Sequence, residues 1–179
     1  MKALLFASLL ASTAHADTIS IDPVSGAVGF TGKNLGDWSI TYERAVTPQH
    51  ALVLEQTTVH VHDDPFHLTN FGLGIGYRYF VREHGSTPFV GALFGGKLGT
   101  GRFGDHGDMS AHSAYATAHA GWRWVTKRLI VTARIGAGIA YYHVEPPNHD
   151  DVMHDVMADD HLKPLPFEID SELAIGWQF

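Results

Sequence analysis

Two-residue periodicity is the feature that most constrains how this chain folds. In residues 70–81, NFGLGIGYRYFV, large apolar side chains alternate with asparagine, glycine and arginine. Successive side chains of a β-strand point to opposite faces of the sheet, so this segment is predicted to be a strand with one apolar face and one small or charged face. The same alternation occurs in four further segments: 37–46, 113–125, 129–142 and 167–179.

Three weaker alternating segments bring the number of predicted strands to eight: 19–31, 51–62 and 88–99. Pro23 limits the first of them to a sheet edge or a strand end, because proline donates no backbone hydrogen bond. No stretch of the chain shows a sustained helical period. The sequence therefore predicts an all-β fold.

The predicted connections alternate in length along the chain. The short ones are 47–50, 82–87 and 126–128, and the longer ones are 62–67, 100–111 and 144–166. In an antiparallel up-and-down arrangement, all short turns then lie at one end of the molecule together with both termini. We expect an eight-stranded antiparallel up-and-down β-barrel.

The inventory of the two strand faces indicates which one points inward. The interior of an eight-stranded barrel is just wide enough for side chains to fill, which excludes a wide pore and leaves no room for all the aromatic side chains of the apolar face. Glycines and mutually paired charges do fit, and a buried charge must be paired. We expect these charges to close the lumen, with an ion path as the alternative; the network is Glu43, Arg78, Arg123, Arg134, Glu168, Asp170 and Glu172.

Aromatic residues of the apolar face gather near the predicted short turns, as in the girdle that a membrane barrel places at one membrane–water boundary. They are Tyr42, Tyr77, Tyr79, Trp122, Trp124, Trp177 and Phe179. Strands of about 9–11 tilted residues suffice to cross a bilayer, and the predicted strands reach that length. We therefore expect a transmembrane β-barrel with a lipid-facing exterior, the alternative being a secreted soluble barrel.

The N-terminal segment has the pattern of a cleaved secretory signal peptide. Lys2 precedes an uncharged apolar stretch, and Ala14-His15-Ala16 matches the small-x-small cleavage site. We predict a signal peptide at 1–16 and a barrel domain at 17–179, with Asp17 as the first mature residue. The stretch is too short for a transmembrane helix, which needs roughly 20 residues.

Charge and cysteine content exclude several classes of function. Removing Lys2 with the signal peptide leaves 11 basic and 19 acidic residues, a formal charge of −8. An acidic chain is a poor partner for nucleic acid. The chain has no cysteine, so neither disulfides nor thiolate chemistry is available to it.

These features resemble the small eight-stranded outer-membrane β-barrels of Gram-negative bacteria, of the OmpA-transmembrane and OmpX type. The resemblance rests on the signal peptide, on the strands FGLGIGYRYFV, AYATAHAGWRWV and LIVTARIGAGIAYY, and on the C-terminal ELAIGWQF. In that family a terminal phenylalanine is the signal for the barrel-assembly machinery, and Phe179 matches it. The resemblance implies a monomer in the bacterial outer membrane, in contact with its lipid and lipopolysaccharide, with a non-enzymatic structural or surface-interaction role.

The predicted longer loops are rich in histidine and aspartate, which suggests divalent metal binding as an alternative function. His60 and His62 are two residues apart and share one strand face, and His67 lies just beyond the following turn. Imidazole and carboxylate suit Zn²⁺ or Cu²⁺. The candidate ligands are His60, His62, His67, His149, His154 and His161; ordinary solvated acidic loops without a bound cofactor are the simpler interpretation.

A lipid A-modifying hydrolase is a further alternative, because some barrels of this size are enzymes. A serine hydrolase needs a serine within hydrogen-bond reach of a histidine. In HSAY, His112 and Ser113 are adjacent and therefore point to opposite faces of a strand. We accordingly expect no enzymatic activity.

Overall fold

The computed structural model describes residues 17–22, 34–63, 66–103, 108–145 and 167–179, and some side chains near the ends of these ranges, including those of His62 and Glu168, lie outside the description. It contains eight strands. They are β1 (Thr18–Asp22), β2 (Asn34–Thr47), β3 (His50–Asp63), β4 (Phe66–Phe80), β5 (Thr87–Phe103), β6 (Asp108–Thr126), β7 (Leu129–Glu145) and β8 (Phe167–Gln178). No helix among the described residues is long and apolar enough to cross a membrane.

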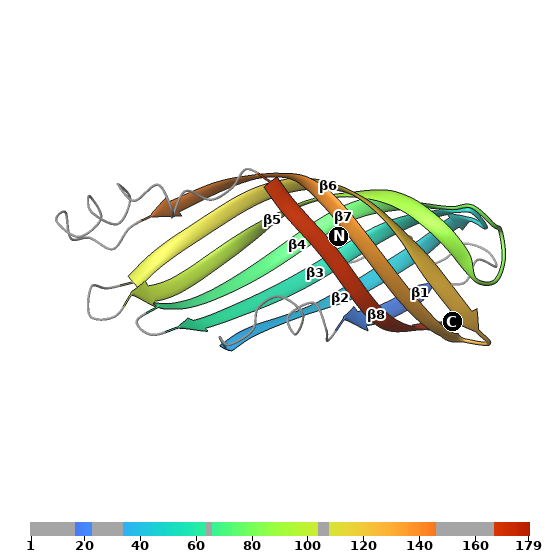
Figure 1. The fold of residues 1–179 in the computed structure, drawn as a ribbon, viewed down its shortest axis with the longest axis horizontal. Helices are drawn as coiled ribbons and strands as arrows, with labels where there is room; N and C mark the ends of the chain where they lie inside the picture. Colours follow the sequence, from blue (N-terminus) through green and yellow to red (C-terminus); the bar gives the residue numbers. More distant parts are fainter. Residues whose placement is uncertain (1–16, 23–33, 64–65, 104–107, 146–166) are drawn as a thin grey trace, which may run out of the picture.

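The eight strands form a closed barrel in which each strand pairs antiparallel with its sequence neighbours (Figure 1). The short β1 closes the ring, since it pairs with β2 on one side and with β8 on the other. Asp22 extends this closure, because its carboxylate accepts a hydrogen bond of 3.1 Å from the backbone N–H of Leu173 on β8. The predicted fold class and strand order are confirmed.

Several strands extend farther than the sequence predicted. β3 and β4 remain paired as far as Asp63 and Phe66, so the longer loop predicted at 62–67 is almost entirely strand. Likewise β5 and β6 remain paired to Arg102 and Asp108, within the loop predicted at 100–111. The ladder extends beyond the apolar exterior because backbone hydrogen bonds maintain it whatever the side-chain polarity. The described part of the first predicted strand is β1, Thr18–Asp22, and the rest of that prediction, 23–31, lies outside the described residues.

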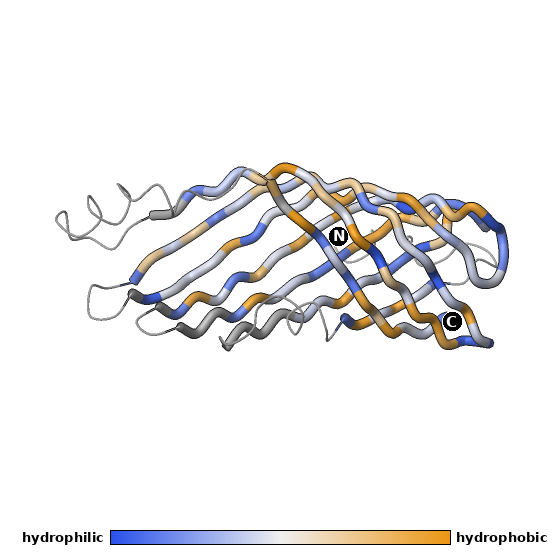
Figure 2. The backbone as a smooth tube through the Cα atoms, in the orientation of Figure 1, coloured by the Kyte–Doolittle hydropathy of each residue, from blue (hydrophilic) through white to orange (hydrophobic). Residues whose placement is uncertain are grey.

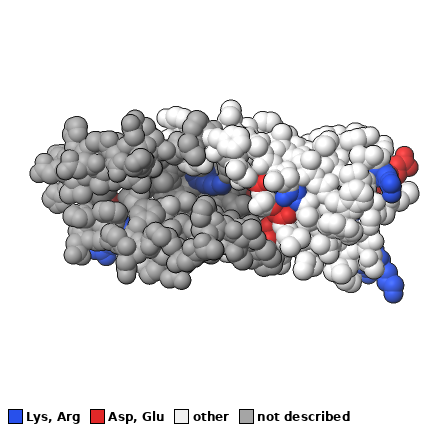
Figure 3. Space-filling model, in the orientation of Figure 1, with Lys and Arg blue, Asp and Glu red and all other residues white. Residues whose placement is uncertain are grey.

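The exterior of the barrel is apolar along most of its length. Large hydrophobic residues alternate outward on every strand, as the banding of the backbone in Figure 2 illustrates. Ile135 and Ile139 of β7 are 67% and 70% exposed. On the face seen in Figure 3, the charged side chains lie mainly at the short-turn end and around a hollow in the middle, and uncharged side chains cover most of the remaining described surface. An exterior of this kind needs an apolar environment.

The predicted aromatic girdle lies on this exterior, close to the short turns. Tyr77, Trp122, Trp124, Trp177 and Phe179 are exposed. The half-buried Tyr42 and Tyr79 are held by polar neighbours. The Tyr42 hydroxyl donates a 2.7 Å hydrogen bond to the Asp17 carboxylate, and the Tyr79 ring lies 5.2 Å from the His50 ring.

Glycines create the space that large lumen side chains occupy. Tyr115 is 7% exposed, and a Cβ added to Gly74 on β4 would lie 2.7 Å from its hydroxyl oxygen. His119 is buried in the same way, and a Cβ on Gly136 of β7 would lie 2.8 Å from the His119 Cβ. These distances are too short for any real side chain. The glycines on the inner face therefore allow a narrow barrel to enclose large side chains in its lumen.

Candidate functional site: the charged lumen

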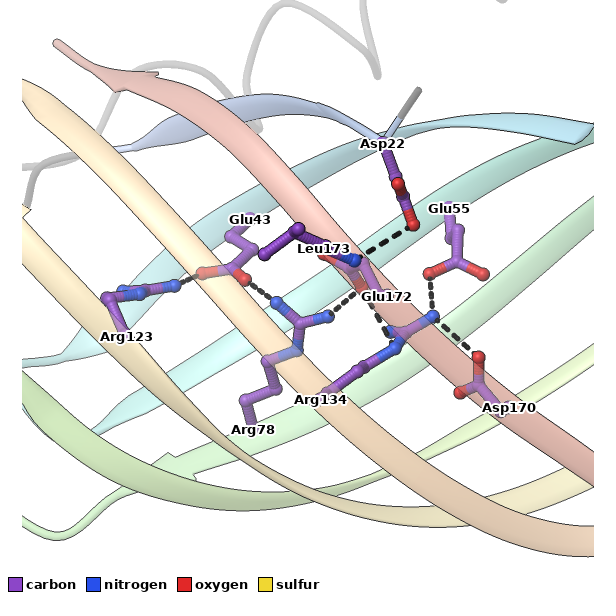
Figure 4. Close-up of polar contacts among 9 residues, drawn as sticks. All are labelled: Asp22, Glu43, Glu55, Arg78, Arg123, Arg134, Asp170, Glu172 and Leu173. Atoms are coloured by element: carbon purple, nitrogen blue, oxygen red, sulfur yellow. Dashed lines mark hydrogen bonds and ion pairs between the residues drawn. The ribbon is translucent and has the colours of Figure 1, made fainter. Parts of the chain in front are cut away.

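Strand alternation brings acidic and basic side chains from six strands to the middle of the lumen. Each belongs to the inner face of its strand because it is in phase with that strand's glycines or other small residues. The described members are Glu43 on β2, Glu55 on β3, Arg78 on β4, Arg123 on β6, Arg134 on β7, and Asp170 and Glu172 on β8. Figure 4 shows them as one connected group.

Arg78 connects β2 to β8 and is 0% exposed. Its Nη1 donates to Glu43, and its Nη2 donates to Glu172 Oε2 at 3.0 Å. Glu43 also forms an ion pair with Arg123. A single buried carboxylate therefore bridges two guanidinium groups from different strands.

Arg134 is the second centre of the network. Its Nη2 donates to Glu55 Oε2 at 2.6 Å and to Asp170 Oδ1 at 3.3 Å. Its Nε lies 2.9 Å from Glu172 Oε2. Glu172 thus contacts both Arg134 and Arg78, and it joins the two halves of the network.

Aromatic rings cover two of the guanidinium groups. Arg123 Cζ lies 4.0 Å from the centroid of the Phe80 ring, and Arg78 Cζ lies 5.0 Å from that of Phe89. A guanidinium group over an aromatic face is attracted by the ring quadrupole, more strongly when water is excluded. The rings also fill lumen volume between the charged groups and the short-turn end.

Four carboxyl groups and three guanidinium groups make up the described network. Charges buried away from water are tolerable only when paired with good geometry, because each loses its hydration. Every described member has at least one ion-pair partner. The arrangement braces six strands against one another.

The network separates two cavities. One, of about 310 Å³, lies toward the short turns and has Glu43 and Arg123 in its wall. The other, of about 150 Å³, has Glu55, Arg134 and Asp170 in its wall. The ion pairs made by Arg78 and Glu172 lie between these two groups of residues.

Six of the seven predicted network residues meet in this cluster: Glu43, Arg78, Arg123, Arg134, Asp170 and Glu172. The side chain of Glu168 lies outside the described residues. Sequence reasoning missed Glu55, because the inner face of its strand also carries Ala51 and Val53 and resembles an apolar face. The signal that would have revealed it is a lone charge inside an otherwise uncharged strand. Asp22, on the shortest strand, was missed as well.

Of the predicted metal ligands, His60, His62 and His67 lie on described strands. The β3–β4 register places His62 opposite His67 and His60 opposite Thr69, and His60 Nδ1 is 3.0 Å from the Thr69 hydroxyl. Within the described part of the chain, no three His, Cys, Asp or Glu side chains gather as a metal site. His149, His154 and His161 lie outside the described residues.

The hydrolase alternative finds no support in the geometry of β6. His112 is exposed on the exterior, whereas Ser113 belongs to the inner face and pairs with Lys97 of β5 in the strand register. The two side chains point away from each other, as their adjacent positions require.

The chain matches no protein-family model and no curated protein. Solved structures do resemble it. The N-terminal β-barrel domain of Pseudomonas aeruginosa OprF superposes with a TM-score of 0.50 at 14% identity, covering 92% of this chain and 96% of that domain. The chain has the fold of a small outer-membrane β-barrel. A major outer membrane protein from Thermus thermophilus superposes on this chain with the same TM-score of 0.50, at 12% identity, over 93% of this chain and 100% of that one.

Proposed function

We propose that this chain is a non-enzymatic outer-membrane barrel with a closed lumen, which serves as a structural or surface-interaction protein. The observation that carries this proposal is the ion-pair network centred on Arg78 and Arg134, which lies between the two lumen cavities. A diffusion pore needs a continuous aqueous channel, whereas paired and braced side chains here occupy the lumen.

Planar-bilayer recording tests the closed lumen. The refolded wild-type barrel is expected to carry no steady ionic current. Opening a path for ions would separate the paired side chains and leave buried charges without partners, which is costly. Arg134→Ala, which removes the side chain that contacts three carboxylates, is expected to produce measurable current. Arg128→Ala, an exposed turn residue, is the control and should remain silent. A steady ohmic current through the wild type would refute the closed lumen.

The proposed location is the bacterial outer membrane, reached through cleavage of residues 1–16. The apolar exterior and the aromatic girdle support contact with membrane lipid and lipopolysaccharide. Fractionation of cells that express the full chain should recover it in the outer membrane as a monomer whose sequence begins at Asp17. Recovery in the soluble periplasm, or with residues 1–16 intact, would contradict this assignment.

Divalent metal binding at His60, His62 and His67 is a second candidate function. The register of β3 and β4 favours it, since His60 and the opposed His62 and His67 occupy one face of the sheet. Titration of Zn²⁺ and Cu²⁺ into the refolded barrel, with the His60→Ala/His62→Ala variant alongside, tests it. A stoichiometric isotherm that the variant loses supports the function, and a flat trace from the wild type rejects it.

A further inference from the structure

Two histidines on the exterior of the barrel, neither of them among the predicted metal ligands, face each other on neighbouring strands. His112 of β6 and His143 of β7 are direct partners in the β6–β7 register. Their ring centroids are 4.7 Å apart, with an angle of 36° between the ring planes. Both side chains are exposed. Two imidazoles are thus held side by side by a ladder that continues on both sides of them.

The pair lies at the edge of the apolar exterior, with the exposed Leu98 of β5 as the register partner of His112 on its other side. On β7, Ile135, Ile139 and Tyr141 point outward and are 67% to 70% exposed, and His143 is the next outward residue along the strand. The next outward-facing positions of this ladder, farther from the β6–β7 turn, are the paired Ser110 and Glu145. Polar positions outside an apolar band are in contact with water, and a hydrated cation needs that access in order to bind.

The separation of the rings matches that required by a shared metal ion. Zinc binds a histidine nitrogen at about 2.0–2.1 Å, so two imidazoles on one tetrahedral ion have ring centres about 5 Å apart. The observed 4.7 Å is close to this value. Because the strands fix both backbones, metal binding has to order only the two side chains, which favours chelation.

We propose that His112 and His143 bind a divalent transition-metal ion of the Zn²⁺, Ni²⁺ or Cu²⁺ class, with water completing the coordination shell. Imidazole nitrogen suits this class, whereas Mg²⁺ and Ca²⁺ prefer oxygen ligands. The site is independent of the lumen network and does not depend on whether the lumen is closed. Simple ring packing between the two histidines is the competing explanation.

Equilibrium dialysis of the refolded mature chain against Zn²⁺ provides the test, with His112→Asn, His143→Asn and the double variant. Each single variant should lose one bound equivalent relative to the wild type, or bind it at least tenfold more weakly. The double variant should lose nothing further, because one imidazole alone no longer chelates. His84→Asn, in the turn at the opposite end and outside every metal site considered, is the control that should retain the equivalent.

Equal Zn²⁺ binding by the wild type and all three variants would overturn the proposal, and so would independent, additive losses in the two single variants. Electron paramagnetic resonance with Cu²⁺ gives a second readout. The difference between wild-type and double-variant spectra should contain a species split by two imidazole nitrogens. A difference spectrum without that species would reject the site. Since both positions are exposed, the variants should fold, which the heat-dependent gel mobility of the barrel verifies.

Discussion

The Nε atom of Arg134 lies 2.9 Å from Glu172 Oε2, across the β7–β8 ladder and inside the barrel. The two residues are partners in the strand register. Glu172 also accepts a hydrogen bond from Arg78, whose β4 lies across the lumen. The pair therefore links neighbouring strands and, through Arg78, opposite sides of the barrel.

Replacement of Arg134 with methionine should strongly destabilise the barrel. It leaves Glu55, Asp170 and Glu172 without one of their cationic partners inside the barrel, where the side chains of Glu55 and Glu172 are only 4% and 1% exposed. Breaking a buried ion pair in this way costs about 3–5 kcal/mol. Urea unfolding followed by tryptophan fluorescence measures the loss, and Arg128→Met is the exposed control. Adding Glu172→Gln to Arg134→Met should cost less than the sum of the two single effects, because the residues are coupled.

The close approach of Gly74 to Tyr115 predicts a specific double-mutant result. In Gly74→Ala, the new Cβ would lie 2.7 Å from the Tyr115 hydroxyl oxygen, and overpacking of this kind costs about 1–3 kcal/mol. Tyr115→Phe removes that oxygen, so Gly74→Ala should cost clearly less in the Tyr115→Phe background. Denaturation midpoints of the four proteins measure the coupling. Equal costs in both backgrounds would show that the glycine is not required to accommodate Tyr115.

The β6–β7 turn contains a strained backbone position. Lys127 has a φ of +58°, which is unfavourable for a residue that carries a Cβ. Lys127→Gly relieves backbone strain of about 1–2 kcal/mol and gives the unfolded chain extra freedom worth about 0.4–1 kcal/mol, so it should raise the free energy of unfolding slightly. Lys127→Val should lower it. A urea midpoint that falls for the glycine variant would contradict this reading of the turn.

Replacement of Phe179 should impair assembly of the barrel in cells more than refolding of the purified chain into detergent. Phe179 is 61% exposed, and its backbone N–H donates a 3.0 Å hydrogen bond to the Asp17 carbonyl. That hydrogen bond does not depend on the side chain, so Phe179→Ala should refold into detergent almost as well as the wild type. If the terminal phenylalanine is the signal for the barrel-assembly machinery, the same variant should accumulate unassembled in cells. Normal assembly of Phe179→Ala in cells would show that the side chain of Phe179 is not the assembly signal.

Alternation, the lengths of the connections and the inventory of the two strand faces together predicted the architecture and the direction in which most side chains point. In β8, for example, Asp170 and Glu172 are two residues apart and necessarily share the inner face. The ion-pair partners could not be predicted, because they depend on strand register and on which strands lie opposite each other in the closed ring. The same limit hid the His112 and His143 pair, whose members are 31 positions apart and meet only through the β6–β7 register. Glu55 escaped notice for a different reason, since its apolar neighbours on the inner face obscured the pattern.

The most direct test of the account is whether the apolar exterior faces lipid. Because the chain has no cysteine, single-cysteine variants carry a nitroxide label at one defined position. Labels at Leu54 and Ile135, both exposed on the exterior, are to be compared in lipid vesicles with a label at Arg128 in the β6–β7 turn. We predict that dissolved oxygen relaxes the labels at 54 and 135 while a water-soluble nickel chelate does not reach them, and that the chelate does reach the label at 128. Ready access of the nickel chelate to positions 54 and 135 would show that water surrounds the barrel and would contradict a membrane-spanning protein.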